Sequence, residues 1–419
     1  MPVSTETSTH NAIAGKIDGP LHGVRILDLS RVLAGPLSGQ LLADLGAEVI
    51  KVERPRVGDD SRSWGPPFMP TPEGSALKES TYFHAANRGK RSVTVDLAQA
   101  EGQALVKSLA SRSDVLIENY KVGTLDRYGL GFEALSKSNP GLIYCSITGF
   151  GQTGPYRMRP GYDTIIQAMS GLMSITGEAG QEPQRVGVAV IDVMTGLYAT
   201  VAILAALRHR SSTGLGQHID LALFEVQLAS LANIGMNYLA TGDVPQRSGN
   251  TNPTIQPSGA FHCSDGQVMV IVGNDGQFTR LCAAMGMEWL VKDERFATNA
   301  ARVTNVVELH AALNSVMSSH SIKHWLDVLG GASIPIGPIN DIEQAFSDPH
   351  VQARDVVQHI RHEALGHVPF IANPIRFSRT PVSYTRPSPM LSQHTAEVLK
   401  EVLGLSKDAV CALSNKGVV

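Results

Sequence analysis

The first 150 residues alternate short apolar runs with stretches of helical spacing, and this alternation constrains the fold more than any other feature. The first apolar run, 24–29, contains Asp28 and is followed by Ser30, and leucines then recur at helical intervals as far as Gly46. Further strand-length runs follow at 48–52, 92–97, 114–118 and 142–147, with a helical stretch at 102–113. Strands alternating with helices at this pitch predict an α/β fold, with a doubly wound parallel sheet covered on both faces.

After residue 150 the pattern changes to longer helical stretches and loops. Helical spacing is found at 164–175, 195–208 and 221–239, and the segment 240–260 is rich in Gly, Pro, Asn, Ser and Thr. We expect five segments along the chain. They are a disordered N-terminus (1–20), the N-terminal part of a large domain (21–220), a linker helix and loop (221–260), a smaller α+β domain (261–340) and a return segment that completes the large domain (341–419).

The charge balance is close to neutral, with 35 Lys and Arg against 38 Asp and Glu. A nucleic-acid-binding domain usually carries a basic surplus, so we expect no nucleic-acid partner. The four cysteines contain no CxxC pair, which favours a reducing compartment over a disulfide framework or a zinc site. The segment from His359 to His367 contains an HExxxH spacing, one residue longer than the zinc helix HExxH, so no metal is expected either.

No stretch indicates export or insertion into a membrane. The first 20 residues lack both the apolar core of a secretory signal and the arginines of a transit peptide. The longest apolar stretch, 197–207, is too short to span a bilayer and is expected to be a buried helix. We therefore expect no membrane partner and a cytoplasmic location, or the mitochondrial matrix in a eukaryote, although no transit peptide is seen.

The strand–turn–helix opening invites comparison with dinucleotide-binding folds, but the first turn does not favour one. Residues 30–36 lack the GxGxxG spacing that lets a backbone approach a pyrophosphate. Glu53 at the end of the second strand suits a ribose, whereas the adjacent Arg54 suits a phosphate. A solvated pair at a strand end explains both residues equally well on spacing alone. NAD is therefore the weaker interpretation.

Asp192 follows an apolar stretch and precedes a helix of small residues. An Asp in this position is usually a helix N-cap. The alternative is a nucleophilic carboxylate near a helix N-terminus, where backbone N–H groups are available to a developing oxyanion. Composition alone favours the cap.

Nine segments together resemble the class III CoA-transferases, also called the CaiB/BaiF family, and the resemblance runs from about Gly23 to the C-terminus. They are GVRILDLSRVLAGP (23–36), GAEVIKVERPRVGDDSR (46–62), ANRGKRSVTVDL (86–97), DVLIENYKVGTLDRYGLG (114–131), SITGFGQTGP (146–155), PGYD (160–163), VIDVMTG (190–196), TGLGQHID (213–220) and SQHT (392–395). The chain is most similar to the members that use succinyl-CoA and short dicarboxylic acids, among them succinate–hydroxymethylglutarate CoA-transferase. The resemblance implies an intertwined homodimer.

The resemblance also implies a ping-pong reaction on Asp192, through an acyl-aspartyl anhydride and an aspartyl-CoA thioester. Coenzyme A thioesters are then substrates, and no permanently bound cofactor is expected. The positions that match the family's CoA-binding residues are Val32, Leu33, Ala34, Arg54, Val95, Asn119 and Arg127. One position departs from the pattern, because some members carry Gln where this chain has Leu33, and Leu33 cannot donate a hydrogen bond from its side chain. Oxyanion stabilisation must then come from backbone N–H groups or elsewhere.

Two other activities fit the same resemblance less well. The α-methylacyl-CoA racemases place an acid/base His where this chain has Tyr162, and an unperturbed Tyr is a poor proton shuttle at neutral pH. A non-enzymatic CoA-binding module would not need Asp192. For an acceptor with two carboxylates, cationic partners are needed. Tyr162 is included among the tentative substrate-binding residues, and the arginine candidates are Arg62, Arg159, Arg185 and Arg247, with Arg185 preferred and a solvated surface role open for each.

Overall fold

The structure is a computed structural model that describes residues 19–71 and 78–419. These residues form two compact units. The first unit contains the described residues up to Ile166, together with Val188–Ser230 and Asp355–Val419, and the second contains Gln167–Gly187 and Leu231–Arg354. The expected boundaries differ from this division, because 167–187 groups with the second unit and the return to the first unit begins at Asp355. The prediction for 1–20 lies, up to residue 18, outside the described residues.

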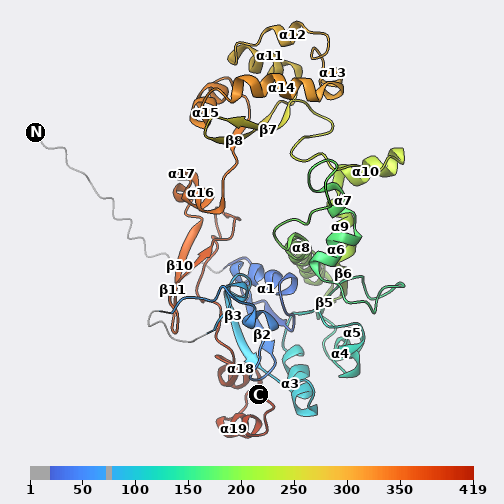
Figure 1. Cartoon of the computed structure of the whole chain (residues 1–419). Coiled ribbons are helices and arrows are strands. Elements are labelled where there is room, and N and C mark those ends of the chain that lie inside the picture. The colour runs from blue at the N-terminus through green and yellow to red at the C-terminus, as the bar shows by residue number, and fades with distance from the viewer. Residues whose placement is uncertain (1–18, 72–77) are drawn as a thin grey trace, which may run out of the picture. The chain divides into compact units, whose positions relative to one another are not determined.

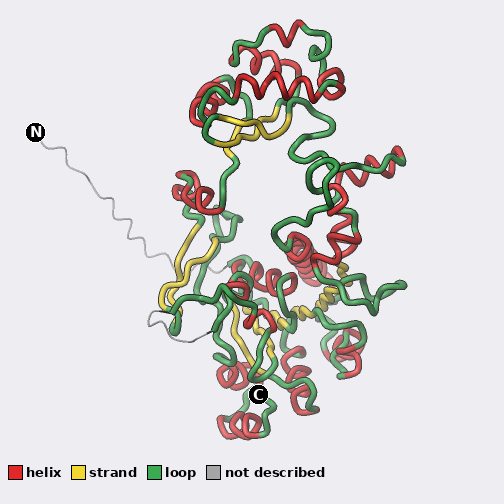
Figure 2. The backbone as a smooth tube through the Cα atoms, viewed as in Figure 1, coloured by secondary structure: helices red, strands yellow, loops and turns green. Residues whose placement is uncertain are grey.

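A six-stranded parallel sheet forms the centre of the first unit (Figures 1 and 2). Its order is β3-β2-β1-β4-β5-β6, which is the order of a doubly wound nucleotide-binding sheet. The strands are β1 (Arg25–Asp28), β2 (Glu48–Glu53), β3 (Lys90–Thr94), β4 (Val115–Glu118), β5 (Ile143–Thr148) and β6 (His218–Ala222). Five of the six were expected from the sequence, and the predicted α/β fold is confirmed.

Helices cover both faces of this sheet. One face packs against α1 (Ala34–Asp44) and α8 (Val190–Thr213), around a core that includes Ile26, Ile143 and Ile203. The other face packs against α3 (Ala100–Ala110) and α18 (Thr395–Leu403). Shorter elements complete the unit, namely η1 (Asp60–Ser63), α2 (Thr81–His84), α4 (Thr124–Arg127), α5 (Phe132–Ser138), α6 (Asp163–Met169, which ends in the second unit), α9 (Leu223–Ser230), β10 (Val357–His362), β11 (Gly366–Ile371) and α19 (Lys407–Asn415).

The second unit is a small α+β assembly with its own core. Its antiparallel sheet has the order β7-β8-β9, formed by Ser258–Cys263, Gly266–Ile271 and Ile336–Pro338. Helices pack on this sheet around Phe261, Phe278 and Trp325. They and the remaining helices of the unit are α7 (Leu172–Ile175), α10 (Ala232–Thr241), α11 (Asp275–Ala284), α12 (Trp289–Lys292), α13 (Asn299–Thr304), α14 (Val306–Met317), α15 (Ile322–Gly331), α16 (Ile342–Ser347) and α17 (Pro349–Ala353).

Helix α8 is longer than the sequence pattern indicates. Its 24 residues begin at Val190 and end at Thr213, whereas helical spacing predicted 195–208. By length and composition it is the one described helix that could cross a membrane, with 39% of its most apolar window buried inside the chain. One face lies in the core of the first unit through Ile191, Ala199 and Ile203, which is how a core helix packs. The opposite face is exposed at Val193, Leu197 and Val201.

Candidate active site

The strand order of the sheet creates a crevice where the chain direction changes. Beyond their carboxyl ends, β1 and β4 are followed by connections that diverge to opposite sides, which is where ligands bind in open α/β sheets. A cavity of about 430 Å³ lies at this point, and we call it the Asp192 cavity. Its lining includes Asp192, the turn at Arg31–Ala34, Asp60, Trp64, Asn119–Val122, Ile147–Gly149, Arg157–Tyr162 and Leu223.

Asp192 lies in the first turn of α8, and it does not cap the helix. The N-cap residue is Ala189, which has no side-chain acceptor to offer. The carboxylate of Asp163 caps the helix instead, since its Oδ2 accepts hydrogen bonds from the amides of Ile191 at 2.8 Å and Asp192 at 3.2 Å. The amides of Val190 and Val193 donate to carbonyl groups of Val188 and Ala189. The first-turn amides of α8 are thus occupied, which corrects the expectation that they are available to an oxyanion.

The pKa of the Asp192 carboxyl group lies close to neutral pH. Burial, and to a smaller extent the nearby carboxylate of Asp163, together raise the pKa of Asp192 from 3.8 to about 7. A group with a pKa near the working pH is partly deprotonated and more nucleophilic than an ordinary carboxylate. Asp163 was not singled out from the sequence, although it is the last residue of the PGYD segment.

Helix α1 begins without a side-chain cap and reaches the same cavity. Its N-cap residue is Leu33, which cannot accept a hydrogen bond from the first turn. Leu33 and Ala34 both line the Asp192 cavity. The positive end of this helix therefore lies at the cavity that Asp192 also lines, and no side chain caps its first amides.

The predicted CoA-binding residues are divided between two adjoining cavities. Val32, Leu33, Ala34 and Asn119 line the Asp192 cavity. Arg54 and Val95 line a second cavity of about 240 Å³, which we call the Arg54 cavity. Both cavities share Arg31 and Tyr120, so they adjoin at these two side chains. The structure places Arg127 at the exposed end of α4, outside the lining of both cavities.

Asn119 holds the protein backbone as well as lining the cavity. Its side-chain oxygen accepts a hydrogen bond from the amide of Arg31 at 2.9 Å, and its side-chain nitrogen donates to the carbonyl of Arg31 at 2.7 Å. Both polar atoms of the Asn119 side chain therefore bond to the backbone of Arg31, and these bonds fix the turn at Arg31–Ala34. Arg31 itself was not predicted from the sequence, although it stands in the first of the matching segments.

The candidate arginines for a substrate carboxylate fall in different places. Arg159 lines the Asp192 cavity, together with Arg157, which the sequence reasoning missed. Arg62 is buried, pairs with Glu53 and Glu79, and does not line the Asp192 cavity, so its substrate contact stays a prediction that this geometry does not favour. Arg185 and Arg247 belong to the second unit, where they donate to backbone carbonyl groups of that unit.

Aromatic side chains form part of the cavity wall. Tyr162 lines the cavity and is 63% exposed. Trp64 also lines it, and the ring of Tyr82 packs edge-on against Trp64 with centroids 5.2 Å apart. Burial, and to a smaller extent the nearby carboxylates of Asp192, Asp163 and Asp59, raise the pKa of Tyr82 to about 12. Trp64 and Tyr82 carried no sequence signal, because their role depends on packing.

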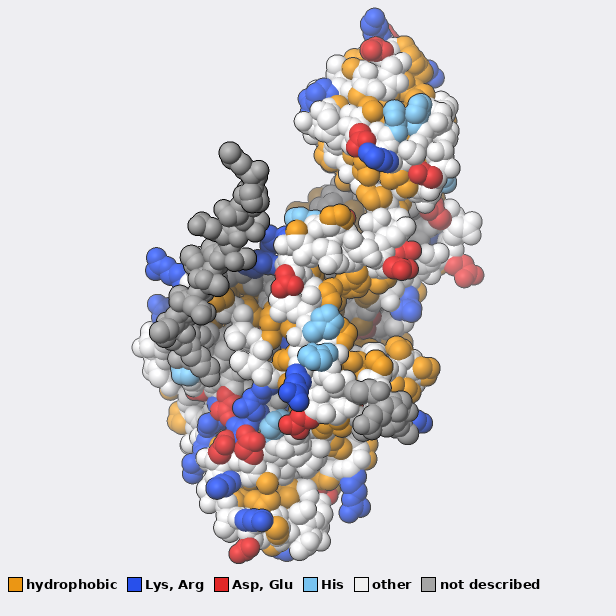
Figure 3. All heavy atoms as spheres, turned by 90° about the vertical axis from the view of Figure 1, so that its left-hand side faces the viewer, with side chains coloured by type: hydrophobic (Ala, Val, Ile, Leu, Met, Phe, Trp, Pro, Cys, Tyr) orange, Lys and Arg blue, Asp and Glu red, His pale blue; other side chains and the backbone are white. Residues whose placement is uncertain are grey.

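The charged side chains elsewhere do not change this picture. Among residues 19–71 and 78–419, no group of three or more His, Cys, Asp or Glu side chains is placed to hold a metal ion. On the face drawn in Figure 3, acidic and basic side chains are interspersed with hydrophobic ones.

Comparison with known proteins places the chain in a family. Residues 21–395 match the profile of CoA-transferase family III. The succinate–glutarate CoA-transferase of Agrobacterium fabrum is 50% identical over 390 residues, covering 93% of this chain and 97% of that protein. The human succinyl-CoA:glutarate CoA-transferase is 43% identical over 400 residues, covering 96% and 90%.

A solved structure extends the agreement to the fold. The crystal structure of a CaiB/BaiF family protein from Brucella suis superposes with a TM-score of 0.82 at 48% identity, covering 92% of this chain and all of that one. Sequence and fold are thus shared over nearly the whole length. The chain belongs to CoA-transferase family III.

Proposed function

We propose that the protein transfers CoA from succinyl-CoA to a short dicarboxylic acid such as glutarate, through covalent intermediates on Asp192. The observation that carries this proposal is the position of Asp192 in a cavity that adjoins a second one beside Arg54. The thioester end of an acyl-CoA fits the first cavity, and the phosphates fit the exposed guanidinium of Arg54. The relatives named for succinyl-CoA and glutarate support the choice of substrates, and they favour transfer over racemisation.

The donor half-reaction needs one nucleophile. The Asp192 carboxylate attacks the thioester carbonyl carbon of succinyl-CoA, the C–S bond breaks, and CoA leaves as a thiolate with a succinyl-aspartyl anhydride behind it. The thiolate then attacks the carbonyl carbon of Asp192, the anhydride C–O bond breaks, and succinate is released. An aspartyl-CoA thioester remains, with the electron pair of the broken bond on the departing succinate.

The acceptor half-reaction runs the same steps in reverse. A carboxylate of the acceptor attacks the aspartyl-CoA carbonyl, and CoA leaves as a thiolate from a new mixed anhydride. The thiolate attacks the acceptor's carbonyl carbon, which forms the product thioester and regenerates the Asp192 carboxylate. No proton is consumed or released over the cycle, so the site needs no dedicated general acid.

Each step passes through an oxyanion, and α1 supplies the donors in this proposal. The first turn of α8 is occupied by Asp163, whereas α1 begins at the Asp192 cavity without a side-chain cap. Fixed backbone amides at a helix N-terminus stabilise developing negative charge without reorganisation. This assignment also explains how the chain works with Leu33 at a position where some members carry Gln.

Arg159 and Arg157 are the proposed partners of the acceptor's distal carboxylate. Both line the Asp192 cavity, whereas Arg62 is committed to Glu53 and Glu79. Arg159 is held over the ring of Tyr156, with the guanidinium carbon 4.0 Å from the ring centroid. Stacking fixes the plane of the guanidinium and leaves its edge open to a carboxylate.

We also propose that the protein is a homodimer. The exposed stripe of α8, formed by Val193, Leu197 and Val201, is apolar over two turns. A contiguous apolar strip of this kind on a core helix marks an association surface. A second copy of the chain would bury the strip, and the resemblance to the family supports this partner.

Intact-protein mass spectrometry tests the chemistry directly. The enzyme is mixed with succinyl-CoA and no acceptor, and peptides are mapped with and without hydroxylamine. We expect a CoA or succinyl adduct on the peptide that contains Asp192, removed by hydroxylamine and absent in Asp192→Asn. An unmodified protein that exchanges the α-proton of a branched acyl-CoA with solvent would instead show racemase chemistry.

A further inference from the structure

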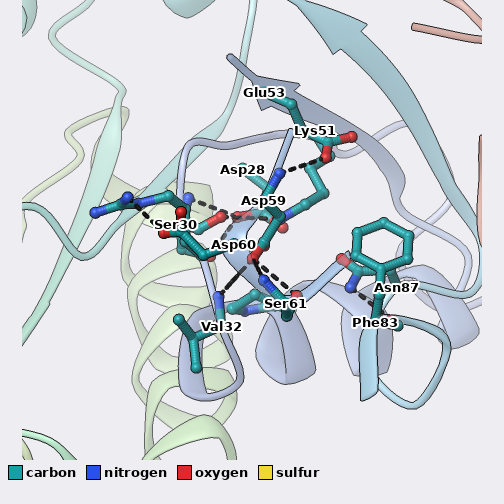
Figure 4. A network of polar contacts seen from close by, with 12 residues as sticks. Asp28, Ser30, Val32, Lys51, Glu53, Asp59, Asp60, Ser61, Phe83 and Asn87 are labelled. Carbon is teal, nitrogen blue, oxygen red and sulfur yellow. Dashed lines mark hydrogen bonds and ion pairs between the residues drawn. The ribbon is translucent and has the colours of Figure 1, made fainter. Parts of the chain in front are cut away.

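A cluster of buried charges lies beside the turn that carries Val32 (Figure 4). Two of its members are lysines with fully buried side chains, Lys51 and Lys90. Lys51 pairs with Asp59 at 2.9 Å, and Lys90 pairs with Asp28 at 2.8 Å. Burying four charges is costly unless each is paired and hydrogen-bonded, so the cluster needs a reason to exist.

The turn beside the cluster has an unusual backbone. Val32 has a φ of +72°, in the left-handed region that a β-branched residue rarely adopts. Such a conformation persists only where the surrounding structure over-determines it, and it marks functional sites more often than others. Val32 and its neighbour Leu33 both line the Asp192 cavity.

Side chains from four separate places fix the backbone of this turn. Asp28, at the end of β1, accepts from the amide and the hydroxyl of Ser30, and Lys51 of β2 donates to the carbonyl of Ser30 at 2.9 Å. Asn119, after β4, holds the amide and the carbonyl of Arg31. The strained residue itself is held by Asp59, whose two oxygens lie 3.1 and 3.3 Å from the Val32 amide.

Asp59 is built to accept that amide. It is 1% exposed, and its carboxylate also pairs with the ammonium group of Lys51. The same carboxylate accepts hydrogen bonds from the amide and the hydroxyl of Ser61. Burial on its own would raise the pKa of Asp59, but the positive charge of Lys51 and the hydrogen bonds from Lys51 and Ser61 lower it to about 2. The carboxylate therefore stays ionised across the physiological pH range. An ionised acceptor forms stronger hydrogen bonds than a neutral one.

We infer that Asp59 is a positioning residue for the transfer reaction, which holds Val32 in the left-handed conformation and thereby aims the start of α1 at the oxyanion. Asp59 lines the Arg54 cavity but not the Asp192 cavity, so its effect on the reacting groups is exerted through the turn. The inference rests on the proposed function, and it adds a residue that the resemblance to the family did not assign. Lys51 serves to keep Asp59 charged in the apolar interior.

The test is a double-mutant cycle between Asp59 and Val32. Asp59→Asn keeps the shape of the side chain but replaces the ionised acceptor with a neutral amide. We expect kcat to fall about tenfold to a hundredfold, as for a small misplacement of catalytic groups, with a smaller change in the KM for succinyl-CoA. Val32→Gly adopts a positive φ without strain, so in the Asp59→Asn background it should recover at least threefold to tenfold in kcat.

The rescue separates positioning from general stability. If Asp59→Asn only leaves Lys51 buried without its partner, adding Val32→Gly removes a side chain and cannot recover activity. Additive effects in the cycle would therefore overturn the inference, as would Asp59→Asn activity equal to wild type. Ser61→Ala is the matched control, because it removes another hydrogen bond to the same carboxylate but leaves the Val32 amide bonded, and its kcat should change less than threefold.

Failure of the inference is distinguishable from failure of the proposed function. The wild-type protein is first assayed for the Asp192 adduct with succinyl-CoA. A wild type without an adduct and without transfer contradicts the proposed function. A wild type with both, combined with an additive double-mutant cycle, contradicts only the role of Asp59.

Discussion

At the residue scale, Asp192 and Asp163 together determine how the enzyme should respond to pH. In the proposed mechanism Asp192 reacts as a carboxylate, and burial together with the Asp163 carboxylate raises its pKa to about 7. Protonation below this pH removes the nucleophile. We therefore expect kcat/KM for succinyl-CoA to fall about tenfold for each pH unit below about 7 and to level off above it. A steady-state pH profile measures this limb.

The contribution of Asp163 can be separated from its structural role. Asp163→Asn keeps an oxygen that can accept from the amides of Ile191 and Asp192, but it removes the charge that raises the pKa of Asp192. In Asp163→Asn, the acid limb of the kcat/KM profile should therefore move to lower pH. Asp60→Asn is the control, because Asp60 lines the same cavity yet is not a cause of the shifted pKa, so its limb should stay in place. Equal movement in both variants would contradict the assignment.

Arg159 should distinguish dicarboxylic from monocarboxylic acceptors. Arg159→Met retains a long side chain over Tyr156 but loses the charge that faces the cavity. We expect kcat/KM for glutarate to fall about tenfold, since a charge-assisted hydrogen bond to this exposed guanidinium contributes about 1–2 kcal/mol, and the value for a monocarboxylate to change little. Arg185→Met is assayed in parallel. A larger loss in Arg185→Met would favour the arginine preferred from the sequence.

At the scale of elements, the spacing between α1 and α8 depends on one glycine. Gly196 lies one turn after Asp192 on α8, and a Cβ added there would stand 2.8 Å from the carbonyl oxygen of Ala34. That atom is backbone in the first turn of α1, so it cannot move without shifting the turn. Gly196→Ala should lower stability by about 1–3 kcal/mol and kcat by roughly tenfold or more.

A second helical glycine provides the matched comparison. Gly330, in α15, has no atom within 4 Å of an added Cβ, and its φ is not positive. Gly330→Ala should stabilise the protein by up to about 1 kcal/mol and leave kcat unchanged, because only the entropy of the unfolded chain changes. Thermal unfolding and steady-state rates measured on both variants check the pair. A stable, fully active Gly196→Ala would show that α1 and α8 tolerate more separation than the contact implies.

The same elements show what the sequence could reveal. Buried parallel strands read as continuous apolar runs, so β1 to β5 were predicted, whereas β6 was missed because His218 and Asp220 interrupt its apolar pattern. The start of α8 was placed five residues late. Its cap comes from Asp163, which is 27 residues before Val190 in the chain, and no local signal records a cap supplied by another element.

Those site residues that lie within the segments resembling the CoA-transferase family could be predicted from the sequence. Asp192 and the turn at 32–34 share one cavity, as expected from the resemblance. The roles of Arg62 and Asn119 could not be read from the sequence, because they depend on partners that lie far along the chain or in another loop. Trp64, Tyr82 and Asp59 were missed for the same reason.

At the scale of the whole molecule, the surface of the first unit predicts its assembly. Val201 is 64% exposed in the middle of α8, in line with Val193 and Leu197. Light scattering coupled to gel filtration should give a mass near twice the chain mass of 44.7 kDa. Val201→Asp introduces a charge that cannot be buried at low cost, so the mass should fall toward that of one chain.

The control must be exposed and apolar but outside the stripe. Leu215, in the turn after α8, is 55% exposed, and Leu215→Asp should leave the mass unchanged. If Val201→Asp dissociates the dimer, transfer activity measured at the same concentration shows whether one chain suffices for the Asp192 chemistry. A wild type with the mass of a single chain, or a dimer that Val201→Asp does not affect, would remove the stripe as the association surface and leave its exposure to be explained by another partner.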